Sequence, residues 1–503
     1  MSQQKRGCGS MKKQCLLLLI SLCVAANAAA APTVADPGRF APVSGKIRDL
    51  ITYWKVPSIA VAVAYKGQVI WEEGFGFSDP ESKVPATGQT VYSLASVSKP
   101  ITATAIMTLV QKGKVRLDDP INRYLGDDKI VARIGNTEDA TIRRVANHTA
   151  GIMPHYKTFD ADRGEQVPPF SQTIQNFGIL VIPPGERFVY SNVGFGLLGH
   201  AVETVSGKEL GTYLKEAIFD PLGLSTAGVN LAVNETPGVA KRYFYGSQKL
   251  PDYDSETPAA GSMFMSAHDL LRFGLFHLKG AIPGQTGAVL TRSSIDEMRT
   301  PLRLNDGHLN EQYGLGWEIG RKHGLKWFGH DGGMSGVTTI LAIYPTADLV
   351  VVVLSNGMTE DDAINSLQDD IVHMVLPATV ALDGGFIPTP QEVGTWRGSI
   401  QKDNEPISVE LNIQKDGSVF VQLDSGPKQG VLLSKKEGPS IHLEGVRALF
   451  GNSGISDAPG QIEFNVTLRS KNHLSGYAAF NALRAFGDRW GSNISYWIDM
   501  QKM

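Results

Sequence analysis

The spacing of hydrophobic residues divides the chain into a mixed α/β region and a β-rich region that follows it. In residues 58–76 an apolar run is interrupted by a Lys-Gly pair, which predicts two strands joined by a tight turn. Residues 96–113 carry apolar side chains at helical spacing and end in glycine, which predicts a helix. Three later runs, 327–333, 336–345 and 348–357, are separated by Gly and Pro-Thr-Ala-Asp turns and predict successive antiparallel strands.

After residue 385 the pattern changes to short alternating strands. Two prolines in residues 388–390 indicate a linker, and residues 407–413 then alternate apolar and polar side chains before a Lys-Asp-Gly turn. We therefore expect residues 36–385 to form a mixed α/β domain. Residues 391–503 are expected to form a separate all-β domain, a small antiparallel barrel or sandwich.

The first thirty residues have the layout of a secretory signal peptide. Basic residues precede an apolar run that is too short to span a bilayer, and a stretch of small residues follows. We expect residues 1–28 to be removed, leaving a periplasmic or secreted chain without a transmembrane segment. A lipid anchor at Cys23 is the less favoured alternative, because Leu22 stands where a small residue is preferred.

Composition and charge narrow the classes of function. The net charge of −3 becomes −7 when the four basic residues of the signal are removed, which gives no electrostatic footprint for nucleic acid. All three cysteines lie in the predicted signal, which excludes a disulfide scaffold, a thiol nucleophile and a cysteine-ligated zinc from the mature chain. We expect neither a metal nor a cofactor, and a small-molecule or peptide substrate.

The first candidate for chemistry is an S-x-x-K pattern. A serine and a lysine three positions apart lie on one face of a helix, and the lysine can take the serine's proton if its surroundings keep it neutral. The pattern alone is weak, because an exposed serine and lysine give the same letters by chance. The amphipathic helix that follows selects Ser96 and Lys99. The five occurrences begin at Ser2, Ser10, Ser96, Ser399 and Ser425.

Two further motifs occur once each, in order, after this pair. Y-x-N occurs at residues 190–192 and H-x-G at residues 330–332. In an extended segment, residues i and i+2 point the same way. We therefore expect Tyr190 and Asn192 to face one pocket, as His330 does, with Asp331 pointing away.

With these motifs in order, the chain resembles the serine β-lactamase-related family, which includes class C β-lactamases, D-amino-acid peptidases and a branch of esterases. The phrases ANHTAGI, YSNVGFGLLG, YGLGW and GHDGGMSG stand where that family has its signatures, and the likeness covers residues 40–380. The resemblance implies a β-lactamase and penicillin-binding transpeptidase-like fold, an antiparallel sheet flanked by helices with an all-helical subdomain. It also likens the C-terminal domain to the lipocalin-like appendages of some family peptidases.

The resemblance implies a catalytic role for several motif residues. Ser96 would be the nucleophile that forms an acyl-enzyme, and Lys99 would accept its proton. Tyr190 would pass the proton to the leaving group and later help to activate water. The oxyanion hole would be formed by the backbone N–H groups of Ser96 and Gly333.

On the substrate side, Asn192 would hydrogen-bond the substrate, and His330 and Gly332 would line the strand edge of the cleft. β-Lactamases usually carry K-T-G on this strand, whose lysine attracts the substrate carboxylate, and K-T-G is absent here. A histidine near its ordinary pKa is mostly neutral at pH 7. We therefore expect a D-amino-acid-type peptidase or an esterase. The alternatives are a β-lactamase, a catalytically silent penicillin-binding-type sensor, and an assembly protein acting through the C-terminal domain.

Other signals receive a structural interpretation. Gly194–Gly199 matches G-x-G-x-x-G, but no second strand of a βαβ unit follows, so helix packing is expected. His148 and His155 lie in loops without companions at metal-ligand spacing, and we expect them to be structural. The aromatic segment 156–170 either lines the pocket or forms an ordinary surface loop.

Overall fold

The computed structural model describes residues 38–503 apart from several short gaps. The predicted signal peptide, residues 1–28, lies outside the described residues, as does the predicted domain boundary at residue 385. The gaps are residues 161–162, 245–247, 306–308, 311–312, 324, 359–362, 365, 377–387, 402–405, 416, 432, 438–439, 450–458 and 483–492.

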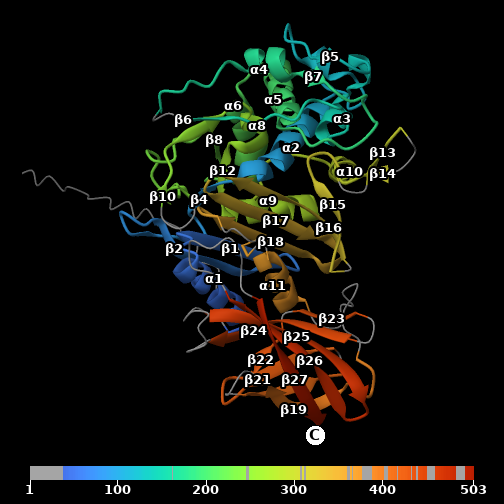
Figure 1. Cartoon of the computed structure of the whole chain (residues 1–503). Coiled ribbons are helices and arrows are strands. Elements are labelled where there is room, and N and C mark those ends of the chain that lie inside the picture. Colours follow the sequence, from blue (N-terminus) through green and yellow to red (C-terminus); the bar gives the residue numbers. More distant parts are fainter. Residues whose placement is uncertain are drawn as a thin grey trace, which may run out of the picture.

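A seven-stranded antiparallel sheet forms the centre of the N-terminal unit (Figure 1). Both ends of the unit meet in it, because β1 pairs with β18 from Ile59 opposite Ser355 to Tyr65 opposite Leu349. The predicted hairpin is confirmed, since β1 and β2 pair. In sheet order the strands are β15 (Glu318–Lys322), β16 (Leu325–Met334), β17 (Val337–Tyr344), β18 (Leu349–Ser355), β1 (Ser58–Tyr65), β2 (Gln68–Asp79) and β3 (Val84–Pro85).

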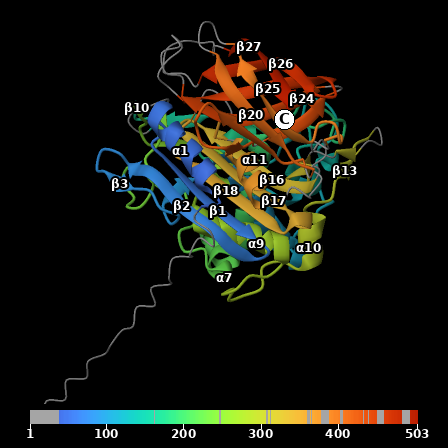
Figure 2. The ribbon, with the colours of Figure 1, turned by 90° about the horizontal axis from the view of Figure 1, so that it is seen from below.

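Both faces of this sheet are buried, which explains the unbroken apolar sequence of β18. Val350 and Val352 face one core, and Val351 and Val353 face the other. A strand buried on both sides has no reason to alternate with polar residues. Figure 2 shows the sheet between α1 and α11 on one side and α9 on the other. The covering helices are α1 (Ala41–Tyr53), α11 (Ser366–Val375), α2 (Ser98–Gln111) and α9 (Ala267–Lys279).

A mainly helical subdomain packs beyond α2, on the side of the sheet away from α1 and α11 (Figure 1). Its longest helix, α5 (Asn192–Ser206), contains the G-x-G-x-x-G match, and all three glycines are buried in the helix, as expected for packing. The short helices are α3 (Ile142–Ala146), α4 (Phe170–Phe177), α6 (Leu210–Leu214), α7 (Asp220–Leu222), α8 (Pro258–Gly261) and α10 (Arg292–Glu297).

Short strands accompany these helices. The sequence analysis expected an all-helical subdomain, and the structure shows a mainly helical one with small sheets. Backbone groups of the long loops pair with one another and thereby satisfy hydrogen bonds that no helix can supply. Three strands form one small sheet, β4 (Val91–Ser93), β12 (Met263–Ser266) and β8 (Gly228–Val229). The two-stranded pairs are β5 (Val131–Ala132) with β7 (Ile179–Leu180), β6 (Thr158–Asp160) with β11 (Tyr253–Ser255), β9 (Tyr243–Phe244) with β10 (Gln248–Lys249), and β13 (Leu302–Arg303) with β14 (Leu309–Asn310).

The C-terminal unit is a single nine-stranded antiparallel sheet that encloses its own core, which confirms the predicted all-β, barrel-like architecture. The first strand, β19, pairs with the last, β27, with Ile400 opposite Ile498. Trp396 is completely buried in this core. The strands are β19 (Gly394–Ile400), β20 (Ile407–Ile413), β21 (Val419–Leu423), β22 (Gln429–Gly430), β23 (Leu433–Glu437), β24 (Ser440–Leu449), β25 (Pro459–Ser470), β26 (His473–Ala482) and β27 (Asn493–Lys502).

Candidate active site

Ser96 lies in a short 3₁₀ turn, η1 (Ala95–Val97), at the start of α2. The preceding residue, Ala95, has a φ of +46°, which is uncommon for a residue with a side chain. The turn is fixed from both sides, because Leu94 N–H donates to the Met263 carbonyl and the Leu94 carbonyl accepts from Thr339 Oγ1 at 2.8 Å. The strained turn leaves Ser96 partly exposed while its neighbours are buried.

Lys99 lies one helical turn after Ser96 and is completely buried. Its Nζ is 2.9 Å from Ser96 Oγ and 2.9 Å from the carbonyl oxygen of Ala260 in α8. Burial lowers the pKa of Lys99 well below its usual range, an effect that the carboxyl of Glu318 partly opposes. The lowered pKa favours the neutral amine, which is the form that can accept a proton from Ser96.

Tyr190 also contacts Ser96. Its hydroxyl is 3.0 Å from Ser96 Oγ, and its ring centroid is 4.8 Å from Lys99 Nζ. Burial raises the pKa of Tyr190, so the phenol keeps its proton until it can pass it on. The structure thus brings together the predicted nucleophile, base and proton carrier.

The sequence interpretation assumed that Asn192 and Tyr190 lie in one extended segment. The structure instead places Asn192 in a helix. Ser191 is extended and is the N-cap of α5, and Asn192 is the first residue of that helix. Ser191 Oγ accepts from the N–H of Gly194 at 3.1 Å, which satisfies one free donor at the helix start. Asn192 remains partly exposed.

The H-x-G motif lies in β16, next to the Ser96 turn. A Cβ on Gly332 would lie 2.2 Å from Thr339 Oγ1 and 2.5 Å from the Leu94 carbonyl oxygen, so only glycine allows this approach. Gly333, in contrast, is exposed, and a Cβ there would meet nothing within 4 Å. The backbone of β16 therefore reaches the nucleophile turn and leaves Gly333 at its open edge.

His330 lies deeper than expected for a residue that lines the cleft, since only 1% of it is exposed. Its Nδ1 is 2.6 Å from the carbonyl oxygen of Asp331, so Nδ1 carries the proton and Nε2 accepts from the Tyr313 hydroxyl at 2.7 Å. Burial and the nearby Lys99 lower the pKa of His330 to about 3. The imidazole is therefore neutral, as the sequence predicted, but Tyr313 covers it.

Glu318, in β15, was not identified from the sequence. Its Oε1 lies 3.7 Å from His330 Nδ1, and its carboxylate accepts a hydrogen bond from the backbone N–H of Asp331. Burial and the charge of Asp331 raise the pKa of Glu318 to about 7. The available signal was its position directly after YGLGW, where a charged residue follows a run of buried ones.

The two loop histidines differ in their relation to this site. His155 Nε2 is within hydrogen-bond distance, 2.6 Å, of Oε1 of the buried Glu256 side chain. This contact supports the structural interpretation of His155. His148 instead packs against the Tyr190 ring with centroids 4.3 Å apart. Tyr156, at the start of the aromatic segment, is exposed over 41% of its surface.

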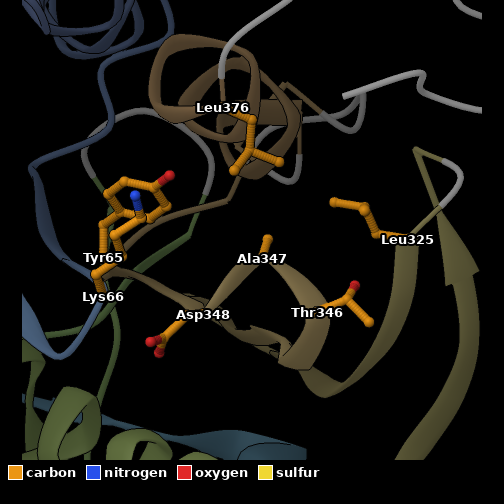
Figure 3. Close-up of a pocket in the computed structure, with 7 residues that line it drawn as sticks. All are labelled: Tyr65, Lys66, Leu325, Thr346, Ala347, Asp348 and Leu376. Atoms are coloured by element: carbon orange, nitrogen blue, oxygen red, sulfur yellow. The ribbon is translucent and has the colours of Figure 1, made fainter. Parts of the chain in front are cut away.

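A pocket elsewhere on the N-terminal unit is unrelated to Ser96. Leu325 begins β16, whereas Gly333 is eight positions further along, roughly 26 Å away in a strand. Figure 3 shows this pocket between the end of β1, the β17–β18 turn and the end of α11. It is lined by Tyr65, Lys66, Leu325, Thr346, Ala347, Asp348 and Leu376.

Within the described ranges, no group of three or more His, Cys, Asp or Glu side chains is arranged to hold a metal ion.

The comparison with protein families agrees with this geometry. The sequence model of the Beta-lactamase family matches residues 46–373, which is more than half of the chain. The chain belongs to the Beta-lactamase family. The predicted family and fold class are confirmed, and so, at the level of the family, is the predicted class of enzyme, a serine hydrolase.

Several named proteins and solved structures are similar to this chain. The unguisins hydrolase of Aspergillus campestris is 27% identical over 62% of this chain, and the match spans only 60% of that protein. Penicillin-binding protein 4 of Amycolatopsis lactamdurans is 26% identical over 70% of this chain and 95% of its own. The D-amino acid amidase of Ochrobactrum anthropi has a similar fold, with a TM-score of 0.54, 22% identity, and coverage of 67% of this chain and 98% of its own.

None of the helices in the part of the chain that the structure describes combines the length and the apolar character needed to cross a bilayer.

Proposed function

We propose that the protein hydrolyses amides or esters through an acyl-enzyme formed on Ser96. The observation that carries this proposal is the position of Ser96 Oγ, within 3.0 Å of both the Lys99 amine and the Tyr190 hydroxyl. Because Lys99 is fully buried and its pKa is lowered, its neutral amine can accept the serine proton.

The same atoms support each later step. As Ser96 Oγ bonds to the substrate carbonyl carbon, its proton moves to Lys99 Nζ, and the carbonyl oxygen gains the negative charge. Tyr190 then donates a proton to the leaving amine or alcohol and recovers one from Lys99. Water attacks the acyl-enzyme by the reverse proton route and releases the carboxylic acid product.

The developing oxyanion would be stabilised by the backbone N–H groups of Ser96 and Gly333. Two observations support this pair. The Ser96 N–H lies at the start of α2, where backbone donors point out of the helix. The tight approach of β16 at Gly332 brings the following residue, exposed Gly333, to the edge of the nucleophile turn. Loss of one such donor typically costs about 10²–10³ in rate.

For the substrate we propose small amides, peptides containing D-amino acids, or esters. His330 is neutral and covered by Tyr313, so it supplies no positive charge for a substrate carboxylate. Asn192, partly exposed at the start of α5, is the candidate donor and acceptor for the substrate amide. The similar fold of an enzyme named D-amino acid amidase supports the same substrate class.

The experiment compares the wild-type protein with Ser96→Ala on three probes: D-phenylalanine amide, a p-nitrophenyl ester and a fluorescent penicillin. Ser96-dependent turnover of the amide or ester, with penicillin released slowly, supports the proposal. Penicillin turnover above that of both other probes would favour a β-lactamase instead. Absence of Ser96-dependent labelling by any probe would favour a silent binding protein.

We also propose that residues 1–28 are a signal peptide and that the mature protein is periplasmic or secreted. The basic, apolar and small-residue order of the sequence supports this. N-terminal sequencing of the exported protein should begin at residue 29. A lipid-modified Cys23 at the new terminus would contradict the proposed cleavage.

Finally, we propose that residues 36–385 and 391–503 are separate domains. Each unit has its own hydrophobic core, and the D-amino acid amidase match covers 67% of the chain, close to the share of the first unit. Limited proteolysis should cut between the two units and release two folded fragments. The division would be contradicted if the intact protein unfolds in a single cooperative transition and neither fragment unfolds cooperatively after the cut.

A further inference from the structure

His148 contacts the backbone on both sides of Tyr190. Its carbonyl oxygen accepts a hydrogen bond from the N–H of Val189 at 2.7 Å, and its Nδ1 accepts one from the N–H of Ser191 at 3.1 Å. His148 itself is 2% exposed and has a φ of +63°. A buried residue with this unusual conformation thus binds the backbone N–H groups of the two residues on either side of Tyr190.

The His148 ring also packs against the Tyr190 side chain. The two ring centroids are 4.3 Å apart with planes tilted by 34°, and the Tyr313 ring lies 4.7 Å away on another side. Because Nδ1 accepts a backbone hydrogen bond, the ring proton is on Nε2 and the imidazole is neutral. Burial and the nearby Lys99 lower the pKa of His148 in agreement with this.

The position of the Tyr190 hydroxyl depends on this segment. Tyr190 lies at the joint just before α5, where the chain is not yet held by helical hydrogen bonds. Its hydroxyl must stay within hydrogen-bond reach of Ser96, and a displacement of about 1 Å at such a group can cost about 10²-fold in rate. The segment before α5 therefore depends on contacts from outside the helix to hold Tyr190 in place, and His148 makes such contacts.

We propose that His148 is a positioning residue that holds the Tyr190 hydroxyl against Ser96 through its ring and its Nδ1 acceptor. It touches no reacting atom in this arrangement. The inference rests on the proposed function, because it assigns to His148 an effect that acts through Tyr190 alone.

The experiment is a double-mutant cycle with Tyr190→Phe, with kcat and KM measured on a p-nitrophenyl ester. His148→Gly tolerates the positive φ and removes both the ring and the acceptor. His148→Phe fills the space but lacks the acceptor. His148→Asn keeps an acceptor and accepts the backbone conformation. The control is His200→Ala, which removes a histidine that lies within α5.

We expect His148→Gly and His148→Phe each to lower kcat about 10- to 100-fold with KM within about twofold, and His148→Asn to recover most of that loss. In the Tyr190→Phe background the same changes should have almost no further effect. If a His148 substitution lowers kcat by the same factor in the Tyr190→Phe background as in the wild type, the two effects are independent. That result would overturn the inference and leave the proposed function intact. Loss of thermal stability that accounts for the fall in activity in every His148 variant would overturn it too. Full activity in Ser96→Ala would instead refute the proposed function.

Discussion

Thr339 Oγ1 donates a hydrogen bond to the carbonyl oxygen of Leu94 at 2.8 Å, across 245 positions of sequence. The bond ties β17 to the turn that carries Ser96, and Thr339 is completely buried. The strained turn therefore has a support in the central sheet, in addition to the hydrogen bond that the Val97 N–H donates to the same carbonyl within the turn.

Replacing this threonine should loosen the nucleophile turn. Thr339→Val removes one of the two hydrogen bonds that the buried Leu94 carbonyl accepts, since the Val97 N–H also donates to it. The loss of one such bond typically costs about 0.5–1.5 kcal/mol of unfolding free energy. We expect a lower Tm and a lower kcat, measured by thermal unfolding and by ester turnover. Thr338→Val, at the neighbouring, partly exposed position of β17, is the control and should change both less.

The close approach at Gly332 gives a second test. In Gly332→Ala the new Cβ would overlap Thr339 Oγ1 and the Leu94 carbonyl, so β16 must move away from Ser96. We expect a loss of activity of at least about tenfold together with reduced stability. Gly320→Ala in β15 is the matched control, because a Cβ there meets nothing within 4 Å. Equal behaviour of the two variants would contradict the inferred contact.

Removal of the proposed base should affect the chemical step more than binding. Lys99→Met keeps the length of the side chain but has no amine, so we expect kcat to fall about 10²–10⁴-fold with little change in KM. Steady-state and single-turnover kinetics on the ester measure both values. Lys112→Met at the exposed end of α2 should behave like the wild type.

The pKa of Glu318, about 7 against an ordinary value of 4.5, predicts a pH-dependent stability. The folded protein binds this proton more tightly than the unfolded chain, so the group stabilises the fold below about pH 4.5 and the benefit is lost as pH rises through 7. Glu318→Gln removes this titration while keeping an acceptor for the Asp331 N–H.

We therefore expect the stability of Glu318→Gln relative to the wild type to increase between pH 5 and pH 8.5. The full linkage of such a shift is about 3 kcal/mol, and the observed change should be smaller because about a third of the side chain is exposed. Denaturant titrations at the two pH values measure it. A difference between the two proteins that is the same at both pH values would show that Glu318 does not titrate in this range.

The sequence alone placed the elements that depend on local spacing. The hairpin turn of β1 and β2 and the helix after Ser96 follow from hydrophobic period and glycine positions. Ser96 and Lys99 are neighbours in any helix that begins there, because positions i and i+3 share a face. The motif order and its resemblance then gave the family, which the comparison confirmed.

Only the tertiary structure decided how these residues are surrounded. Tyr190 reaches Ser96 across 94 positions of sequence, and Glu318 lies beside His330 because β15 pairs with β16. No local sequence pattern encodes these contacts. The low pKa of Lys99 comes from its burial beneath distant segments, and the depth of His330 comes from Tyr313. Local spacing fixes which groups point the same way along one element. Burial and charge, which set their chemistry, arise only when separate elements pack together.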